Sequence, residues 1–317
     1  MNLSSVTGWL TDLTRIIFKA SEEIYPGYSP QALKNKLGLM IAAVRHQSAL
    51  RQFFKRMSVA PLQQVKLNTS DVIGMTVWPY INNAWTVQER LDKKAGHYEL
   101  LATHYPLFFS MVLTEPLMLM NLEAYSPGLS LVLDQPVWFK REGECVLSLF
   151  VQGTRVSSVA FTFGCETERM VCYIGAFQGM TQSVTLAERQ LIIQTLSHDF
   201  DGMRVTSLLL TMLQIITHTL GLSCLLGVDD AHRHHRHPFF GPFDPQQLVT
   251  DYDRLWSENA GVPDDISGFY RISTVFHRRL PAEIAPRKRA LYDRRYRRLD
   301  QLSRELSLRL GAPEHAS

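Results

Sequence analysis

Four histidines lie close together, shortly after an apolar segment that ends at Val228: His232, His234, His235 and His237. Imidazole nitrogens are common zinc ligands, and an unperturbed imidazole also titrates near neutral pH, where it can act as a general base. The cluster lacks partners at the i, i+4 spacing of a helical metal motif and has no cysteine pair nearby. We therefore expect no metal ligand here and take His232 as a candidate catalytic base.

Two glycine-containing turns indicate places where a ligand can approach the backbone. Gln178 and Gly179 end one predicted strand, and Gly202 and Arg204 come just before a predicted helix. A helix N-terminus attracts phosphate or carboxylate groups, and an arginine can add a two-pronged contact. These residues can therefore hold an anion, although ordinary turns would use the same glycines.

A short segment rich in acids and aromatic side chains runs from Asp251 to Trp256. Asp251 can position a substrate amine, because a carboxylate attracts an ammonium group. The same composition would also serve to anchor a short helix on a sheet. Both interpretations stay open, and Asp251 joins Gln178 and His232 as a catalytic candidate.

The most concentrated positive charge lies in residues 287–298, where seven Lys and Arg residues stand against Asp293 alone. Tyr292 and Tyr296 alternate with the arginines four residues apart, which places both rings on one face of a helix. Arginine contacts phosphate, and tyrosine can stack on bases or pack on the protein. The candidate anion-binding residues of the whole chain are Gly179, Gly202, Arg204, Arg289, Tyr292, Arg294 and Arg295.

Charge is unevenly distributed over the 317 residues, although the formal net charge is only +3. Residues 24–70 hold seven Lys and Arg and no acidic residue, and residues 271–309 hold twelve against four acidic ones. Such asymmetry usually reflects partners rather than fold. We expect the two basic segments to form a surface for a polyanion, namely tRNA, a lipopolysaccharide precursor or an anionic membrane surface.

The first third of the chain has the hydrophobic spacing of helices. An amphipathic helix is predicted within residues 1–20, and Ser29-Pro30 predicts the start of another that runs to about residue 57. The apolar positions of this second helix include Leu33, Leu37, Ile41 and Val44, whereas Lys34, Arg45 and Arg56 lie toward the opposite side. A further helix is predicted over 90–105, followed by a very apolar stretch, 107–123, that should pack in the core.

The pattern changes near residue 136 to short segments rich in β-branched and aromatic residues, which predict an antiparallel meander. The predicted strands are 137–140, 145–151, 156–163 and 170–177. Helices at 186–197 and 206–220, a buried strand at 222–228, a helix at 246–256, a strand at 269–273 and a basic helix from 286 to about 310 should follow. We expect an α+β fold in which a helical N-terminal region, 1–125, packs on a mainly antiparallel sheet in residues 126–317.

Several familiar kinds of site are absent from the sequence: it has no Walker loop, HExxH motif or nucleophile elbow. Cys145 and Cys172 are expected to face the sheet core as inert, reduced thiols. Charged residues within the first twenty argue against a secretory signal. The uncharged run 205–228 is long enough to span a membrane, but Gln214 and Gly221 favour a buried helix and strand instead. We expect a cytoplasmic protein without a transmembrane span.

Several of these segments, taken in order, resemble the VirK/YbjX family of Gram-negative bacteria. They are Ile174–Gly179, Gly202–Val205, Asp251–Trp256 and Lys288–Tyr292. The resemblance covers residues from about 29 to 298. It implies an association with virulence, with resistance to cationic antimicrobial peptides and with modification of the envelope or its lipopolysaccharide, and it carries over no set of catalytic residues.

The predicted order of meander, glycine turn, helix and buried strand also resembles the core of GNAT acyltransferases. In that superfamily the turn after the fourth strand holds the pyrophosphate of the acyl donor, and some branches take the acyl group from aminoacyl-tRNA. This chain departs from the pattern, because the helix 186–197 is additional and no Q/R-x-x-G-x-G/A loop is present.

These patterns lead to the hypothesis of a GNAT-like acyl- or aminoacyl-transferase that modifies an envelope component such as a lipopolysaccharide sugar. No cofactor is certain from the sequence; the donor would be aminoacyl-tRNA or acyl-CoA, and the protein could be peripheral at the inner membrane. Gln178, His232 and Asp251 would lie at the acceptor, and residues 202–204 at the anionic end of the donor. The alternative is a non-enzymatic adaptor that binds nucleic acid, anionic lipid or a partner protein through its basic surfaces.

Overall fold

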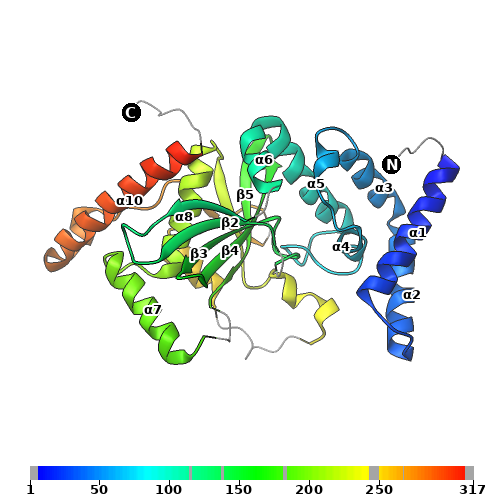
Figure 1. Cartoon of the computed structure of the whole chain (residues 1–317), viewed down its shortest axis with the longest axis horizontal. Helices are drawn as coiled ribbons and strands as arrows, with labels where there is room; N and C mark the ends of the chain where they lie inside the picture. The colour runs from blue at the N-terminus through cyan, green and yellow to red at the C-terminus, as the bar shows by residue number, and fades with distance from the viewer. Residues whose placement is uncertain are drawn as a thin grey trace.

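The computed structural model describes residues 6–113, 116–136, 139–180, 184–242, 250–266 and 268–310. Helices of the N-terminal region lie beside a mixed sheet, and further helices flank the sheet on its other side (Figure 1). The chain therefore has the α+β architecture that the sequence predicts.

The N-terminal region is helical up to residue 113. Its elements are α1 (Val6–Ile24), α2 (Pro30–Arg45), α3 (Gln47–Met57), the short η1 (Leu62–Gln64), α4 (Thr69–Gly74), α5 (Val87–His104) and α6 (Pro106–Leu113). Ser29 begins α2 by accepting a hydrogen bond from the Ala32 N–H, and Thr86 and Glu89 form a capping box at the start of α5. These starts follow directly from local sequence chemistry.

Eight strands of the described residues form one sheet, in the order β1-β2-β3-β4-β5-β6-β8-β7. They are β1 (Leu117–Asn121), β2 (Leu129–Asp134), β3 (Cys145–Val151), β4 (Thr154–Glu166), β5 (Arg169–Gln178), β6 (Cys224–Val228), β7 (Val262–Pro263) and β8 (Phe269–Ile272). Strands β1 to β5 form an antiparallel meander. Within the described chain, β5 and β6 are the only parallel neighbours, and this pair joins the meander to the β6-β8-β7 part.

The crossover from β5 to β6 runs through two helices, α7 (Leu186–Asp199) and α8 (Val205–Thr219). The remaining elements are the short η2 (His234–Arg236) and η3 (Pro238–Phe240), α9 (Tyr252–Glu258), the short η5 (Pro281–Glu283) and η6 (Pro286–Lys288), and α10 (Arg289–Arg309). Helix α8 is buried along most of its length, because its apolar run packs against β3, β4, β6 and α10. No described helix is long and apolar enough to cross a bilayer.

The centre of the sheet is covered on both faces. Residues 156–164 of β4 are all buried, although successive side chains of a strand point to opposite faces. Helices α5 and α8 both pack against β4 and supply this cover. Cys145 and Cys172 are fully buried in this core, and burial raises the pKa of both thiols well above its usual value.

Some boundaries differ from the predicted ones. The helix expected to run from residue 30 to 57 is two helices, which meet at His46, where the backbone leaves the helical region (φ −102°, ψ 21°). Strands β1, β2 and β7 were not predicted. Residues 139 and 140 are not in a strand, and 137 and 138 lie outside the described residues, as do 246–249 of the predicted helix 246–256.

The two basic segments lie at opposite ends of the molecule rather than side by side. In Figure 1, α1 to α3 occupy the right-hand end and α10 the left-hand end, with the sheet between them. Part of the N-terminal charge is neutralised, because Lys36 pairs with Glu22 at 2.7 Å and Arg56 pairs with Asp92 at 2.6 Å. The sequence left open whether the two basic segments adjoin, and the structure places them on two separate surfaces.

Candidate functional site

Strands β5 and β6 part beyond the pair Ile174–Gly227, and side chains of α9 fill the space between them. The phenol oxygen of Tyr252 accepts a hydrogen bond from the Phe177 N–H at 2.6 Å, and its hydroxyl donates to the Phe177 carbonyl at 3.3 Å. The Trp256 indole donates to the Val228 carbonyl at 2.8 Å. A side chain at Gly227 would lie 2.5 Å from the Trp256 ring, so this close packing requires glycine.

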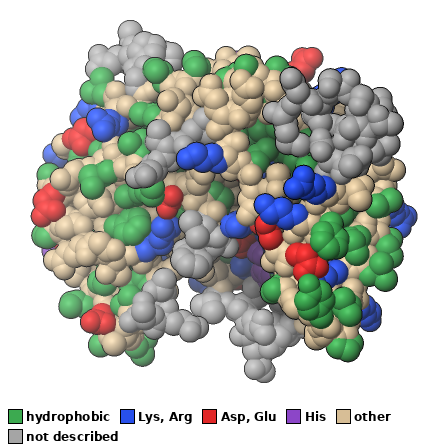
Figure 2. Space-filling model, turned by 45° about the vertical axis from the view of Figure 1, so that its right-hand side comes forward, with side chains coloured by type: hydrophobic (Ala, Val, Ile, Leu, Met, Phe, Trp, Pro, Cys, Tyr) green, Lys and Arg blue, Asp and Glu red, His purple; other side chains and the backbone are tan. Residues whose placement is uncertain are grey.

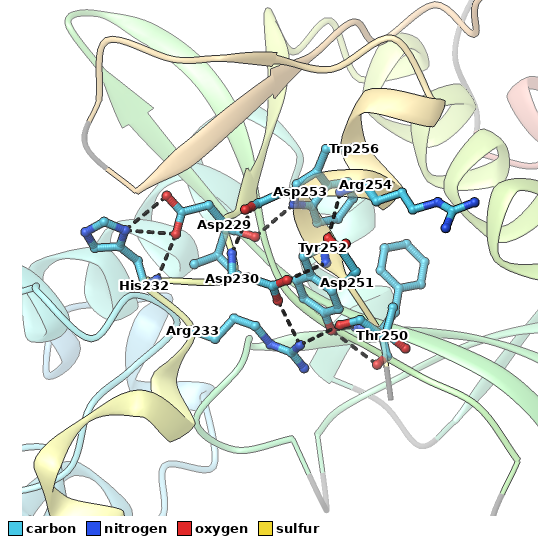
Figure 3. A network of polar contacts seen from close by, with 12 residues as sticks. Asp229, Asp230, His232, Arg233, Thr250, Asp251, Tyr252, Asp253, Arg254 and Trp256 are labelled. Atoms are coloured by element: carbon cyan, nitrogen blue, oxygen red, sulfur yellow. Dashed lines mark hydrogen bonds and ion pairs between the residues drawn. The ribbon is translucent and has the colours of Figure 1, made fainter. Parts of the chain in front are cut away.

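A polar network occupies the carboxyl end of β6 (Figure 3). Asp230 accepts hydrogen bonds from the Tyr252 N–H at 3.1 Å and from the Arg233 guanidinium at 3.2 Å. The same guanidinium lies 3.8 Å from the centre of the Tyr252 ring. The Asp230 N–H donates to the Asp253 carboxylate at 3.1 Å. The network fixes α9 against the end of β6 and keeps Tyr252 in the parting of the strands.

His232 lies at one edge of this network, with its Nδ1 2.8 and 3.0 Å from the two carboxylate oxygens of Asp229 (Figure 3). Asp229 also accepts the His232 N–H at 2.7 Å. When Nδ1 carries the proton, Nε2 keeps a free lone pair, which is how a carboxylate orients a catalytic imidazole. The imidazole is 29% exposed, so a ligand can reach it.

The other two predicted catalytic residues differ from His232 in their surroundings. Asp251 is the N-cap of α9 and accepts the Arg254 N–H at 2.9 Å, so it caps the helix, whereas Tyr252 and Trp256 attach the helix to the sheet. Gln178 is the exposed last residue of β5 and lies in register with Ser158 of β4. Asp251 precedes Tyr252, and Gln178 follows Phe177, so both lie near the parting of β5 and β6. Among the described side chains, no hydrogen bond or ion pair joins either of them to His232.

A second group of ionisable residues surrounds a cavity of about 260 Å³ between α4 and the segment before β3. Glu142 Oε1 lies 3.3 Å from His234 Nδ1, and the two side chains are 18% and 15% exposed. The Arg141 guanidinium lies 4.5 Å from the centre of the Trp78 ring. Asp71 and Lys140, which pair at 2.9 Å, complete the lining.

Burial favours the uncharged forms of both Glu142 and His234. Desolvation raises the pKa of Glu142 to about 7, against the opposing pull of Arg233 and Arg141. It lowers the pKa of His234 to about 3, helped by His235, Arg141 and Arg233. Near neutral pH His234 is therefore uncharged, and Glu142 is poised between its two forms, which is the condition that acid–base chemistry needs.

A larger cavity of about 370 Å³ lies at the N-terminus of α8 and contains several predicted anion-binding residues. Gly202, Arg204, Tyr292 and Arg295 all line it, and Arg279 adds a further cation that was not predicted. Arg204 is the N-cap of α8 and makes no side-chain cap, so first-turn N–H groups remain available to a ligand. Glu258 lines the same cavity and pairs with Arg204, so it offsets part of the charge.

The remaining predicted anion-binding residues lie outside this cavity. Arg294 is on the other side of the turn at Asp201, where its Nε lies 3.2 Å from the Asp201 carboxylate. Arg289 bonds the Ile284 carbonyl at 3.4 Å, and Gly179 has no atom near the position of a side chain. The structure thus groups four of the seven predicted residues.

Sequence reasoning missed Asp229, Arg233, Tyr252 and Glu142. Asp229 and its neighbour follow a predicted strand directly, and Asp229 is three residues before His232, so this pair was visible as a spacing. Nothing in the sequence indicates Glu142, because its environment comes from distant segments. Among the described residues, no group of three or more His, Cys, Asp or Glu side chains could hold a metal ion.

Comparison with known proteins identifies the family to which the chain belongs. A family model described as "Protein of unknown function (DUF535)" matches residues 29–307. The chain therefore belongs to this family, which is the VirK/YbjX family that its motifs resemble. It is 24% identical over 310 residues to the "Uncharacterized protein YbjX" of Escherichia coli (strain K12), covering 88% of this chain and 92% of that protein. No solved structure matches it significantly.

Proposed function

We propose that the chain is a GNAT-like transferase that moves an acyl or aminoacyl group from a phosphate-bearing donor to an acceptor. The observation that carries this proposal is the sheet topology. An antiparallel meander ends in β5, which runs parallel to β6 after a crossover through α7 and α8, and β6 is followed by α9 and the antiparallel β7 and β8. This order resembles that of the acyltransferase core, apart from the additional helix α7, and the likeness supports the proposal by analogy of fold.

The cavity at the start of α8 is the proposed site for the anionic end of the donor. Arg204, Arg279 and Arg295 offer guanidinium groups to phosphate, and the helix N-terminus adds its dipole. Glu258, the last residue of α9, lines this cavity, whereas Tyr252, the first residue of α9, lies where β5 and β6 part. Seven helical residues span about 10 Å. An elongated donor, such as acyl-CoA or the end of aminoacyl-tRNA, fits that separation.

The chemistry requires a base at the reacting end of the donor. We assign this role to His232, whose Nδ1 faces Asp229. An amine or hydroxyl of the acceptor forms a bond to the donor carbonyl carbon, while His232 Nε2 takes its proton. The bond from that carbon to the sulfur or oxygen of the carrier then breaks, and the proton passes to the leaving group.

The proposed acceptor is an envelope precursor such as a lipopolysaccharide sugar, modified on the cytoplasmic side of the inner membrane. Support for this part comes from the family resemblance alone. An added amino acid would bring positive charge to the envelope and weaken its attraction for cationic antimicrobial peptides. Such a change would account for peptide resistance and virulence.

Lipopolysaccharide mass spectra of a strain lacking the gene, complemented with defined variants, test this proposal. The wild-type gene should restore a mass increment equal to one acyl or aminoacyl group, and the exposed control His104→Ala should restore it too. His232→Ala and Arg295→Ala should not. Identical spectra with and without the gene, under conditions in which the protein is present, would reject the transferase.

A non-enzymatic adaptor is a second candidate, favoured by the basic face of α10. Arg294, Arg297 and Arg298 line a surface hollow with Tyr125. Arg297 is exposed, and within the described part of the chain its guanidinium makes one hydrogen bond, to the Asp293 carbonyl of its own helix. An adaptor would bind polyanions with an affinity that falls with salt, that Arg297→Glu weakens, and that His232→Ala leaves unchanged. Binding that Arg297→Glu leaves intact would remove the basis for this candidate.

A further inference from the structure

Helix α2 presents an apolar stripe to solvent. Leu33, Leu37, Ile41 and Val44 are 49%, 55%, 59% and 56% exposed. Their spacing places them within about 80° of the helix circumference and along about 16 Å of its axis. Figure 2 shows hydrophobic side chains gathered on the part of the surface where the N-terminal helices lie. The apolar side chains that the sequence places on one face of this helix therefore face solvent and not the protein core.

A different face of α2 attaches it to the protein. Lys36, Leu39 and Ala43 are buried, and the Lys36 ammonium pairs with Glu22 at 2.7 Å. The same ammonium lies 4.6 Å from the centre of the Tyr28 ring. This face already holds the helix, and about half of each side chain in the stripe remains open to solvent. A contiguous apolar surface of this kind usually marks an interaction site.

Positive charge borders the stripe. Lys34 and Arg45 are exposed, lie beside the stripe on the helix rather than opposite it, and take part in no ion pair among the described side chains. Residues 24–70 contain no Asp or Glu, so no acidic side chain of α2 or α3 offsets them. An apolar strip bordered along one edge by unpaired cations is complementary to a bilayer with anionic headgroups.

We propose that α2 docks on the surface of an anionic phospholipid bilayer, with its axis parallel to the membrane plane. The four apolar side chains enter the boundary between headgroups and acyl chains, and Lys34 and Arg45 contact the lipid phosphates. A second copy of the chain fits this face less well. Two antiparallel α2 helices would bring their cations together, with no acidic residue in the segment to pair with them. This inference does not depend on the transferase.

Vesicle co-sedimentation of the full chain tests the proposal. The wild-type chain should partition onto phosphatidylcholine vesicles containing phosphatidylglycerol and bind pure phosphatidylcholine weakly. Leu37→Asp with Ile41→Asp should lower the partition coefficient at least tenfold, by about the effect expected for two charged residues at an interface. The matched control is Leu186→Asp with Leu191→Asp on α7, where both leucines are 65–70% exposed. The control should bind as the wild type does.

The charged border is tested separately with Lys34→Glu and Arg45→Glu. Together they should weaken binding to the anionic vesicles by about tenfold or more, and salt should weaken wild-type binding in the same direction. Circular dichroism checks that every variant is folded. Equal binding by the α2 and α7 variants would overturn the proposal. So would a concentration-dependent dimer that the α2 substitutions abolish, because the stripe would then be covered by a second copy.

Discussion

At the scale of single residues, the position of Glu142 in the fold determines its protonation near neutral pH. Its carboxylate faces His234, and Asp71, Lys140, Arg141 and Arg233 are the other charged groups around it. Desolvation outweighs the two arginines and raises its pKa from 4.5 to about 7. A carboxyl group with that pKa is protonated in the folded chain at a pH where the unfolded chain has already lost the proton.

The stability of the protein should depend on pH through this residue. The folded chain binds the Glu142 proton more tightly than the unfolded chain. Ionisation therefore lowers the free energy of unfolding as pH rises from about 4.5 to about 7, and the full penalty persists above that range. Glu142→Gln removes the ionisation. Its free energy of unfolding relative to wild type should be higher at pH 8 than at pH 5, by on the order of 3 kcal/mol.

Urea unfolding at the two pH values, followed by circular dichroism, measures this difference. His234 has the opposite linkage, because its lowered pKa removes stability as pH falls below about 6.5, and both proteins share that slope. The exposed Gln63→Ala changes no ionisable group, so as a control it should show the same pH dependence as the wild type. A difference for Glu142→Gln that is the same at pH 5 and pH 8 would contradict the assignment.

Local patterns in the sequence pointed to two of the places described above, and the roles of their residues stay predictions. Gly202 and Arg204 adjoin the start of an apolar helix, and His232 belongs to a histidine cluster that follows a strand. Arg295 was visible as part of a basic run, but its meeting with Arg204 depends on α10 packing against α8. Glu142 could not be found, because its pKa results from burial among distant segments.

At the scale of elements, strands and helices with local signals were predicted well, and those shaped by distant packing were not. Thr185 and Glu188 form a capping box that begins α7, as its sequence suggests. The break between α2 and α3 at His46 has neither Gly nor Pro to announce it. The stripe from Leu33 to Val44 has the period of a core-facing helix, and period alone cannot tell a protein core from another apolar surface.

The packing of the segment before β3 on β5 should be sensitive to one glycine. A Cβ at Gly175 would lie 2.0 Å from the Glu142 carbonyl oxygen, which is backbone and cannot move aside without shifting the segment. Gly175→Ala should lower the free energy of unfolding by about 2 kcal/mol or more. Gly96→Ala in α5, where no atom lies within 4 Å, should raise it by roughly 0.5–1 kcal/mol. Chemical denaturation measures the free energy of unfolding of both variants. Equal changes in the two variants would show that the segment before β3 shifts at little cost to accommodate the added methyl group.

At the scale of the whole molecule, the two basic surfaces lie at opposite ends with the sheet between them (Figure 1). Charge changes at the two ends should therefore act independently on a polyanion that contacts the chain at random. Each of Lys34→Gln and Arg297→Gln should lower the salt concentration at which the chain elutes from a heparin column. The double variant should show the sum of the two shifts. A much larger combined shift would mean that one polyanion engages both ends at once.

The lone parallel pair at the centre of the sheet also has a consequence for how the chain folds. Strands β1 to β5 are consecutive in the chain, so each can pair with the next by closing one loop. Strand β6 can pair with β5 only after α7 and α8 have packed on the sheet. We expect the β5–β6 pair to be the last part of the sheet to form. Tyr252 bonds both backbone groups of Phe177 and so holds α9 against the strand pair that forms last. The candidate site is therefore assembled in the same step that completes the fold.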